Sequence, residues 1–310
     1  MGEPDLSTTL CGVKLRNPLV LASGILGTTA ELLYRVAQSG AGMVTTKSCG
    51  LTPRKGYPNP TVLDWGHGLI NAVGLANPGV EEEVKIIAQA KQRLDFMGVP
   101  LAASVFADTV EGFAEVAGRV SEAQPDFIEL NISCPNVADE MGQPFACDAG
   151  QAAEVTVAVK GVTSIPIIVK LSPNVADIAC IARRVEQAGA DALTAINTLG
   201  PGMIIDVESR RPILANKVGG ISGPAIRPIA VRCVHDIYRV VKIPIIGIGG
   251  VSDGRDVLEM VMAGATAVGI GSAVRYRGLG AFARTLEELR TLMQELGLVS
   301  LKELVGSAHS

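Results

Sequence analysis

The chain has 310 residues, a formal net charge of −4 and 48% hydrophobic residues, of which few are aromatic. This length fits one large domain or two ordinary ones, and the hydrophobic fraction is enough to bury a large core. The sequence contains no run of basic residues, so it gives no electrostatic support for a nucleic-acid or anionic-membrane partner.

The first ten residues contain neither a positively charged region nor an apolar stretch, so we expect no signal peptide. No segment approaches the ~20 apolar residues that a membrane-spanning helix needs. We therefore expect a soluble, cytoplasmic protein.

Cysteine and histidine are few and scattered. There is no C-x-x-C pair and no metal-ligand spacing among Cys11, Cys49, Cys134, Cys147, Cys180, Cys233, His67, His235 and His309. This pattern predicts neither a disulfide framework nor an iron–sulfur or zinc site. We expect no metal, and we expect most of the cysteines to be small core residues.

Short apolar runs alternate with helical patterns along the chain. The runs cover residues 18–25, 42–48, 100–106, 126–133, 165–172, 191–198, 243–250 and 266–273. Amphipathic patterns lie between them, at 81–96, 109–123, 151–162, 175–188, 224–241, 254–263 and 281–296. Strands alternating with helices in this way indicate βαβ units and a parallel sheet.

A closed barrel and an open doubly wound sheet both fit this alternation. Eight units with polar residues and glycine after nearly every strand favour a single (β/α)8 TIM barrel, because an open sheet places its ligand at one switch point. No linker or shift in composition divides the chain, so residues 1–310 are predicted to form one domain. Residues 49–80 and 199–223 are too long for plain loops and are expected to form small insertions, such as hairpins, over the barrel mouth.

The residues that end the predicted strands are candidates for an active site, since barrel enzymes keep their sites at that end. Any one of them could be an ordinary turn residue. Two lysines and two asparagines in these positions are harder to explain as turns, because a buried charge needs a partner. The strand ends are Ser23-Gly24, Lys47-Ser48, Ser104, Asn131 to Cys134, Lys170, Asn197-Thr198, Gly249-Gly250 and Gly271-Ser272.

The last two strands end in glycine-rich turns that are typical of a phosphate site. Glycine lets backbone N–H groups approach a phosphate closely, although tight turns alone could also explain either pair. Neither turn fits G-x-G-x-x-G, because Ser252 and Val274 stand where the third glycine should be. With such a site, Lys170 could stabilise negative charge on a flavin or act as the Schiff-base amine of a lyase.

Cys134 follows the fourth predicted strand in the sequence Asn131-Ile132-Ser133-Cys134-Pro135-Asn136. Pro135 disfavours helix at this point and helps to present the thiol on a loop. A thiolate acting as base or nucleophile is one interpretation. No histidine stands nearby in the sequence, which argues against a papain-like nucleophile.

Several motifs together resemble the class 1 dihydroorotate dehydrogenases. They are TTKS (45–48), NAVGLANPG (71–79), NISCPN (131–136), VKLSPN (169–174), INTLGPGM (196–203), KVGGISGPAIRP (217–228) and IPIIGIGG (243–250). The resemblance runs from about residue 6 to residue 296. A cysteine at position 134 resembles class 1 rather than class 2, which has serine there and a membrane-binding extension. LANPGVEEE (75–83) and residues 200–220 resemble the NAD-linked 1B subgroup more than the fumarate-reducing 1A subgroup.

This resemblance implies that dihydroorotate is oxidised to orotate in pyrimidine biosynthesis, with FMN as cofactor. Cys134, assisted by Lys47, would be the catalytic base that removes the C5 proton while hydride passes from C6 to flavin N5. The implied substrate-binding residues are Lys47, Asn71, Ala72, Val73, Gly74, Leu75, Asn131, Asn197 and Thr198. The implied FMN-binding residues are Ser23, Lys47, Ser48, Asn131, Lys170, Ile196, Gly223, Gly249, Gly250, Gly271 and Ser272. Relatives often have an asparagine that contacts the flavin at the end of the third strand, where this chain has Ser104. Whether Ser104 contacts the flavin is left open.

The 1B resemblance also implies a partner. A homodimer of catalytic chains would associate, as a heterotetramer, with a subunit that carries FAD and a [2Fe–2S] cluster and passes electrons to NAD+. Two alternatives stay open on the sequence alone: a phosphate-binding lyase that uses Lys170, and a binding subunit without catalytic activity. A fumarate-linked 1A enzyme is a third possibility, within the same family.

Overall fold

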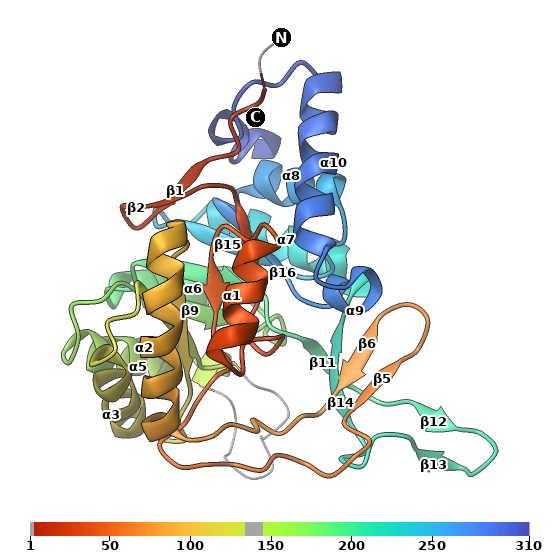
Figure 1. The fold of residues 1–310 in the computed structure, drawn as a ribbon. Coiled ribbons are helices and arrows are strands. Elements are labelled where there is room, and N and C mark those ends of the chain that lie inside the picture. The colour runs from red at the N-terminus through yellow and green to blue at the C-terminus, as the bar shows by residue number, and fades with distance from the viewer. Residues whose placement is uncertain (1–2, 134–144, 310) are drawn as a thin grey trace.

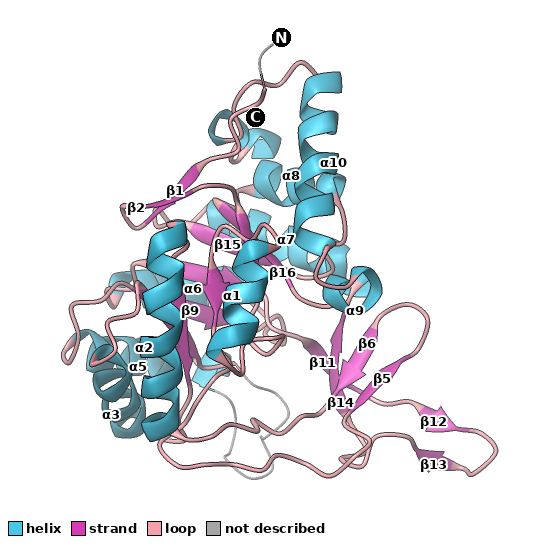
Figure 2. Cartoon of the chain, viewed as in Figure 1, coloured by secondary structure: helices cyan, strands magenta, loops and turns pink. Residues whose placement is uncertain are grey.

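The computed structural model describes residues 3–133 and 145–309. Its centre is a parallel eight-stranded sheet that curves into a barrel, with helices outside it (Figures 1 and 2). The strands, in chain order, are β3 (Leu19–Leu21), β4 (Val44–Thr45), β7 (Leu101–Val105), β8 (Phe127–Asn131), β9 (Ile167–Leu171), β10 (Ala192–Ala195), β15 (Ile245–Ile248) and β16 (Ala267–Ile270). Each lies inside one predicted apolar run. A parallel bridge between Val20 and Met43 joins β3 to β4 and brings the two edges of the sheet together. The predicted barrel is confirmed.

The predicted helical patterns correspond to helices. The α-helices are α1 (Ala30–Gln38), α2 (Val80–Met97), α3 (Val110–Ser121), α5 (Ala149–Lys160), α6 (Ile178–Gln187), α7 (Arg227–Tyr238), α8 (Gly254–Ala263), α9 (Ala273–Arg277) and α10 (Ala281–Glu295). Short 3-10 turns are η2 (Phe145–Cys147), η3 (Pro224–Ile226), η4 (Lys302–Leu304) and η5 (Ser307–His309). The pattern predicted at 224–241 is therefore a 3-10 turn followed by α7. Pro228 stands in the first turn of α7, where its missing N–H costs nothing.

Side-chain caps fix where several helices begin. Thr109 accepts a hydrogen bond from the backbone N–H of Gly112 at the start of α3. Asp177 caps α6 in the same way, which explains why that helix starts later than residue 175, where its amphipathic pattern begins. Such caps satisfy N–H groups that have no partner within the helix.

A short antiparallel hairpin closes the end of the barrel where the strands begin. It consists of β1 (Thr8–Leu10) and β2 (Val13–Leu15), and the sequence patterns above did not predict it. Its buried Leu10 and Leu15 pack in one apolar cluster with interior residues that include Phe127. Both chain ends lie on this side of the molecule in Figure 1.

The two predicted insertions meet in a small antiparallel sheet on the opposite side (Figure 1). Its order is β11-β14-β6-β5, so that β6 (Leu69–Asn71) of the first insertion pairs with β14 (Gly219–Ser222) of the second. β5 (Val62–Asp64) and β11 (Leu199–Gly202) lie at its edges, and a second hairpin of β12 (Ile205–Asp206) and β13 (Arg211–Pro212) extends from it. The predicted hairpins over the mouth are confirmed, and they join into one sheet.

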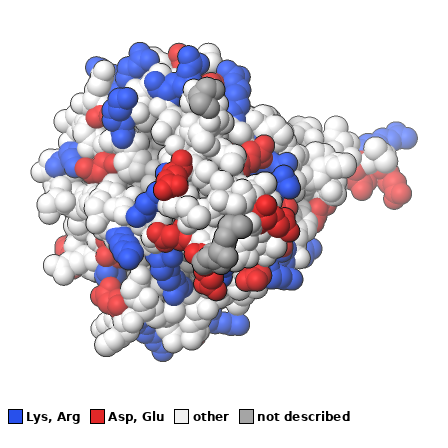
Figure 3. Space-filling model, turned by 90° about the horizontal axis from the view of Figure 1, so that it is seen from above, with Lys and Arg blue, Asp and Glu red and all other residues white. Residues whose placement is uncertain are grey.

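Acidic and basic side chains are interspersed on the face shown in Figure 3. This distribution matches the small net charge of −4. Among residues 3–133 and 145–309, no helix combines the length and apolar character needed to cross a membrane.

Candidate active site

A pocket opens at the C-terminal ends of the barrel strands, between the barrel and the small antiparallel sheet. Seven of the eight barrel strands, or the loops that follow them, contribute residues to its wall, and β7 is the exception. The predicted site residues that line it are Ser23, Lys47, Ser48, Asn71, Val73, Gly74, Leu75, Asn131, Lys170, Ile196, Asn197, Thr198, Gly223, Gly249, Gly250, Gly271 and Ser272. Residues that are far apart in the sequence therefore meet at one site.

Two predicted residues are not among them. Ala72 is buried in a small apolar cluster with Ile70 and Leu214, so it supports the antiparallel sheet instead of facing the pocket. Cys134 lies outside the described residues, and the structure says nothing of its side chain.

The pocket also has lining residues outside the implied substrate- and FMN-binding sets: Ala22, Gly24, Ile25, Val62, Leu69, Ser222, Ile226, Ile248, Val251 and Gly269. Half of them, namely Ala22, Gly24, Ser222, Ile248 and Val251, stand next to a predicted residue in the chain, and that adjacency was the available signal. Leu69 has no such neighbour, and it faces Ser222 in the β6–β14 pair. The pairing of the two insertions brings Leu69 to the pocket.

Amide side chains from β8 and the end of β10 form a hydrogen-bonded group in the pocket wall. The Asn197 Nδ2 donates to Asn131 Oδ1 at 3.2 Å and to Ser133 Oγ at 2.9 Å. Asn197 Oδ1 accepts from the backbone N–H of Thr198 at 2.8 Å. These bonds fix which end of each amide is the donor, so the wall offers donors and acceptors in set positions.

A second group of polar contacts ties β6 to β14 and joins the loop after β9 to the segment that leads into β11. Asn71 Nδ2 donates to the backbone oxygen of Gly220 at 3.3 Å, which ties β6 to β14. The Asn174 Nδ2 donates to the backbone oxygen of Thr198 at 3.2 Å, and its Oδ1 accepts from the backbone N–H of Gly200 at 2.9 Å. Asn174 thus holds both ends of the peptide segment that carries Thr198 into the pocket.

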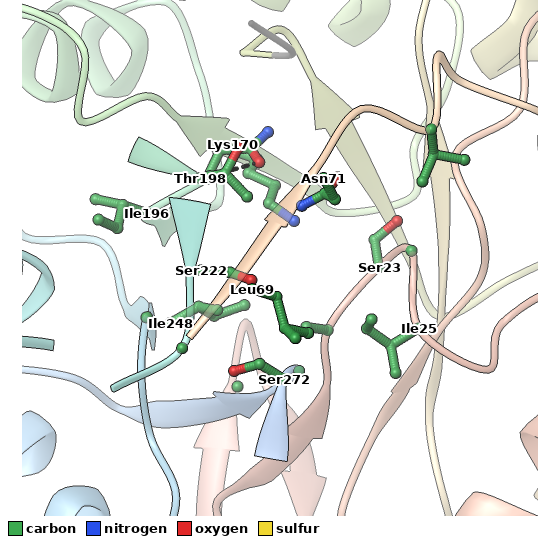
Figure 4. A pocket seen from close by; sticks show the side chains of 18 of the residues that line it. Ser23, Ile25, Leu69, Asn71, Lys170, Ile196, Thr198, Ser222, Ile248 and Ser272 are labelled. Atoms are coloured by element: carbon green, nitrogen blue, oxygen red, sulfur yellow. Dashed lines mark hydrogen bonds between the residues drawn. The ribbon is translucent and has the colours of Figure 1, made fainter. Parts of the chain in front are cut away.

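Lys170 reaches the pocket from inside the barrel. Its side chain is 7% exposed, and its Nζ lies 3.6 Å from Oε1 of the equally buried Glu129. This ion pair offsets the cost of burying a charge. Figure 4 shows Lys170, Thr198 and Asn71 on one side of the pocket and Ser272 on the other. Lys47 approaches from β4, and a Cβ built on Gly24 would lie 3.8 Å from its Nζ.

Three serine hydroxyls connect the wall to the barrel interior. Ser23 Oγ lies 3.2 Å from Ser48 Oγ, which in turn lies 2.8 Å from Ser104 Oγ. Ser104 is fully buried and donates to Glu129, so it lies beneath the pocket instead of in its wall. The hydrogen bonds of the Ser104 hydroxyl are to Ser48 and Glu129.

Glycines form the side of the pocket near Ser272. Gly223, Gly249 and Gly250 have φ values of +95°, +141° and +75°, which favour glycine. A Cβ on Gly250 would come within 2.7 Å of the Gly223 oxygen, so the backbones are in close contact here. Gly271 is different: a Cβ there would meet nothing nearer than Ala22 Cβ at 3.5 Å. An open, glycine-lined side of this kind fits a bound phosphate group.

Comparison with known proteins agrees with this geometry. The family model described as "Dihydroorotate dehydrogenase" matches residues 5–293. A protein of Methanothermobacter thermautotrophicus is 48% identical over 98% of both chains, and one of Methanocaldococcus jannaschii is 46% identical over the full length of both. A relative from Pyrococcus abyssi is 45% identical over 98% of this chain and 99% of its own. Each of the three is described as "Dihydroorotate dehydrogenase B (NAD(+)), catalytic subunit". This chain therefore belongs to the dihydroorotate dehydrogenase family.

Proposed function

We propose that this chain is the catalytic subunit of an NAD-linked dihydroorotate dehydrogenase, which oxidises dihydroorotate to orotate in pyrimidine biosynthesis. The observation that carries the proposal is the agreement of two findings. Full-length relatives bear this description, and nearly all of the predicted site residues line one pocket. Family membership also argues against the lyase that would use Lys170 as a Schiff-base amine.

The pocket fits FMN, which members of this family bind. Gly249, Gly250, Gly271 and Ser272 would hold its phosphate, since their side of the pocket leaves the backbone accessible. Lys170 would lie at the end of the ring that becomes negative on reduction. When bound, FMN supplies the acceptor for the hydride that leaves C6 of dihydroorotate.

The chain's own residues would bind the substrate and move a proton. Asn131 and Asn197, whose amides are oriented by their mutual hydrogen bond, would bind the pyrimidine ring together with Asn71 and Thr198. Lys47 would bind the carboxylate. Cys134 would remove the C5 proton. It directly follows Ser133, which is fully buried and hydrogen-bonded to Asn197.

The domain and partner assignments are part of the same proposal. Residues 1–310 would form one domain, and two such chains would pair at the centre of a heterotetramer. The partner subunit would carry FAD and a [2Fe–2S] cluster and pass electrons to NAD+. The word "subunit" in the relatives' descriptions supports a partner of this kind.

The test is reduction of the bound flavin without air. The purified chain is expected to absorb as a flavoprotein and to lose that absorbance when dihydroorotate is added. A colourless protein, even after incubation with FMN, would refute the proposed cofactor. A flavoprotein that dihydroorotate does not bleach would refute the proposed substrate.

A second experiment separates the acceptors. The chain alone is expected to reduce its flavin with dihydroorotate yet to turn over slowly with NAD+, and to gain NAD+ activity with its electron-transfer subunit. Rapid NAD+ reduction by the isolated chain would contradict the division into two subunits. Rapid turnover with fumarate would place the chain with the fumarate-linked enzymes instead.

A further inference from the structure

Glu129 is an acidic residue inside the barrel that the proposed reaction does not use. It sits in the middle of β8 and is 3% exposed, directly beneath the pocket. Its carboxylate contacts side chains of three other strands, the neighbours β7 and β9 and also β10 beyond β9. Oε1 accepts from Ser104 of β7 at 3.3 Å and pairs with Lys170 of β9 at 3.6 Å, and Oε2 accepts from Thr194 of β10 at 3.0 Å.

The hydrogens of the serine chain can be assigned from this carboxylate. As the anionic partner of Lys170, Glu129 can only accept, so Ser104 must donate to it. The single hydroxyl hydrogen of Ser104 is then used. Ser48 must therefore donate in the 2.8 Å contact between the two hydroxyls. Asn131 Nδ2 in turn donates to Ser48 Oγ at 3.1 Å.

The result is a directed chain of donors from Asn131 through Ser48 and Ser104 to Glu129. The Asn131 amide is thereby held with its NH2 towards Ser48 and its oxygen towards Asn197. Glu129 thus acts on two pocket residues: on Lys170 directly, and on Asn131 through two hydroxyls.

We propose that Glu129 is a positioning residue that orients Lys170 and Asn131, and that its negative charge limits how strongly Lys170 stabilises an electron-rich ring in the pocket. This proposal rests on the FMN site proposed above. In this buried setting two charges interact much more strongly than in water. Removal of the negative charge should therefore favour the reduced, more anionic cofactor.

The test compares Glu129→Gln with Ser104→Ala in the full-length chain, with FMN in excess. Glu129→Gln removes the charge at nearly constant volume. We expect it to shift the flavin's equilibrium with a reference dye towards the reduced form by about tenfold, which is about 30 mV for a two-electron couple. We also expect it to weaken orotate binding.

Ser104→Ala is the matched control, because it breaks the donor chain and leaves both charges in place. It should weaken orotate binding by roughly fivefold, the value of one hydrogen bond, and leave the dye equilibrium unchanged. An unchanged or opposite dye equilibrium in flavin-loaded Glu129→Gln would overturn the proposal. So would a shift of equal size in Ser104→Ala.

If Glu129→Gln does not fold, the double variant Glu129→Gln with Lys170→Gln decides, since it has no unpaired buried charge. Cooperative unfolding restored in the double variant supports the pairing, and its continued failure to fold overturns it. A wild-type chain that takes up no flavin, or whose flavin dihydroorotate does not bleach, would refute the proposed function itself before any variant is compared.

Discussion

The two ends of the barrel differ in what fills them. At the end where the strands begin, Leu10 and Leu15 of the hairpin pack on interior side chains such as Phe127 in an apolar cluster. At the other end, the interior contains Glu129 and Lys170 beneath an open pocket. One end therefore contributes mainly to stability, whereas the other holds charged and polar groups around the pocket.

The acidic residues show the same contrast. Asp126 and Asp191 stand just before β8 and β10, and each joins a backbone N–H of the preceding strand to a lysine of a helix. Asp126 accepts from the N–H of Leu101 at 2.8 Å and from Lys91, and Asp191 accepts from the N–H of Ile167 at 2.7 Å and from Lys160. Glu129, at the other end, contacts groups that lead to the pocket. Acids before the strands connect structural elements, and the acid within the strand organises the site.

The largest effect should come from Cys134 at the pocket end. Cys134→Ala should slow flavin reduction by dihydroorotate by roughly 10²–10⁴-fold, the value of a positioned base, and leave orotate binding intact. Stopped-flow measurement of the reduction rate checks this. The exposed Cys180 provides a control, and Cys180→Ala should reduce its flavin at the wild-type rate. A wild-type rate in Cys134→Ala would end the assignment of the base.

The opposite end should respond in stability alone. Leu10 is fully buried in the apolar cluster, so Leu10→Ala should lower the free energy of unfolding by about 2–5 kcal/mol. Denaturant unfolding measures this change. In Leu10→Ala, flavin content and the rate of flavin reduction should stay near wild type at low temperature. The control is Leu296→Ala, at an exposed position, which should change neither flavin content nor the rate of reduction. Loss of flavin in folded Leu10→Ala would show that the two ends are coupled.

Gly271 tests the glycine side of the pocket. Its backbone φ is not positive and a Cβ has space, so Gly271→Val should fold. The added methyl groups would occupy the proposed phosphate site and weaken FMN binding by about 5- to 150-fold, equivalent to an overpacking cost of 1–3 kcal/mol. Titration of the apoprotein with FMN measures this. Gly250→Val is a poorer test, since its Cβ would strain the backbone at Gly223. Full FMN affinity in Gly271→Val would refute the phosphate assignment.

Glu83, on α2, should make stability depend on pH. It is 1% exposed, and neither carboxylate oxygen has a hydrogen-bond partner in the described part of the chain. Burial raises the pKa of this carboxyl to about 7, and the nearby Thr46 hydroxyl lowers it only in part. A carboxyl whose folded pKa lies above its ordinary 4.5 favours folding while it is protonated. Its contribution is therefore complete below pH 4.5 and is lost as the pH rises through 7.

Glu83→Gln should remove this dependence. Between pH 5 and pH 8 the wild type should lose about 1–3 kcal/mol of unfolding free energy that the variant keeps. Thermal unfolding across this range measures the difference. Glu82→Gln, at a half-exposed position on the same helix, should behave as the wild type does. Parallel pH profiles for wild type and Glu83→Gln would contradict the burial argument.

Much of this arrangement could be predicted from the sequence, and the exceptions have physical causes. Side chains along a strand point alternately to its two faces, so those of Phe127, Glu129 and Asn131 in β8 all face the barrel interior. This alternation could have predicted that Glu129 lies inside the barrel. Ala72 faces away for a related reason, since it directly follows Asn71 at the end of β6. The hairpin of β1 and β2 is too short for a clear pattern. Pairing between insertions depends on contacts distant in sequence, which no local pattern records.

The smallest expected effect concerns backbone protection over the pocket. Thr198, Ser222 and Gly223 line the pocket at the two ends of the second insertion, so a ligand that contacts them should stabilise residues 199–223. A ligand that binds only the closed form lowers the population of the open form by the factor 1 + [L]/Kd, which is about tenfold when orotate is present at ten times its Kd. Hydrogen exchange of backbone amides in 199–223 should therefore slow by up to that factor. Residues 8–15, in the hairpin at the opposite end, serve as the internal control because none of them lines the pocket. Equal slowing at both ends would mean that orotate stabilises the whole barrel, and no slowing in 199–223 would remove this insertion from the binding site.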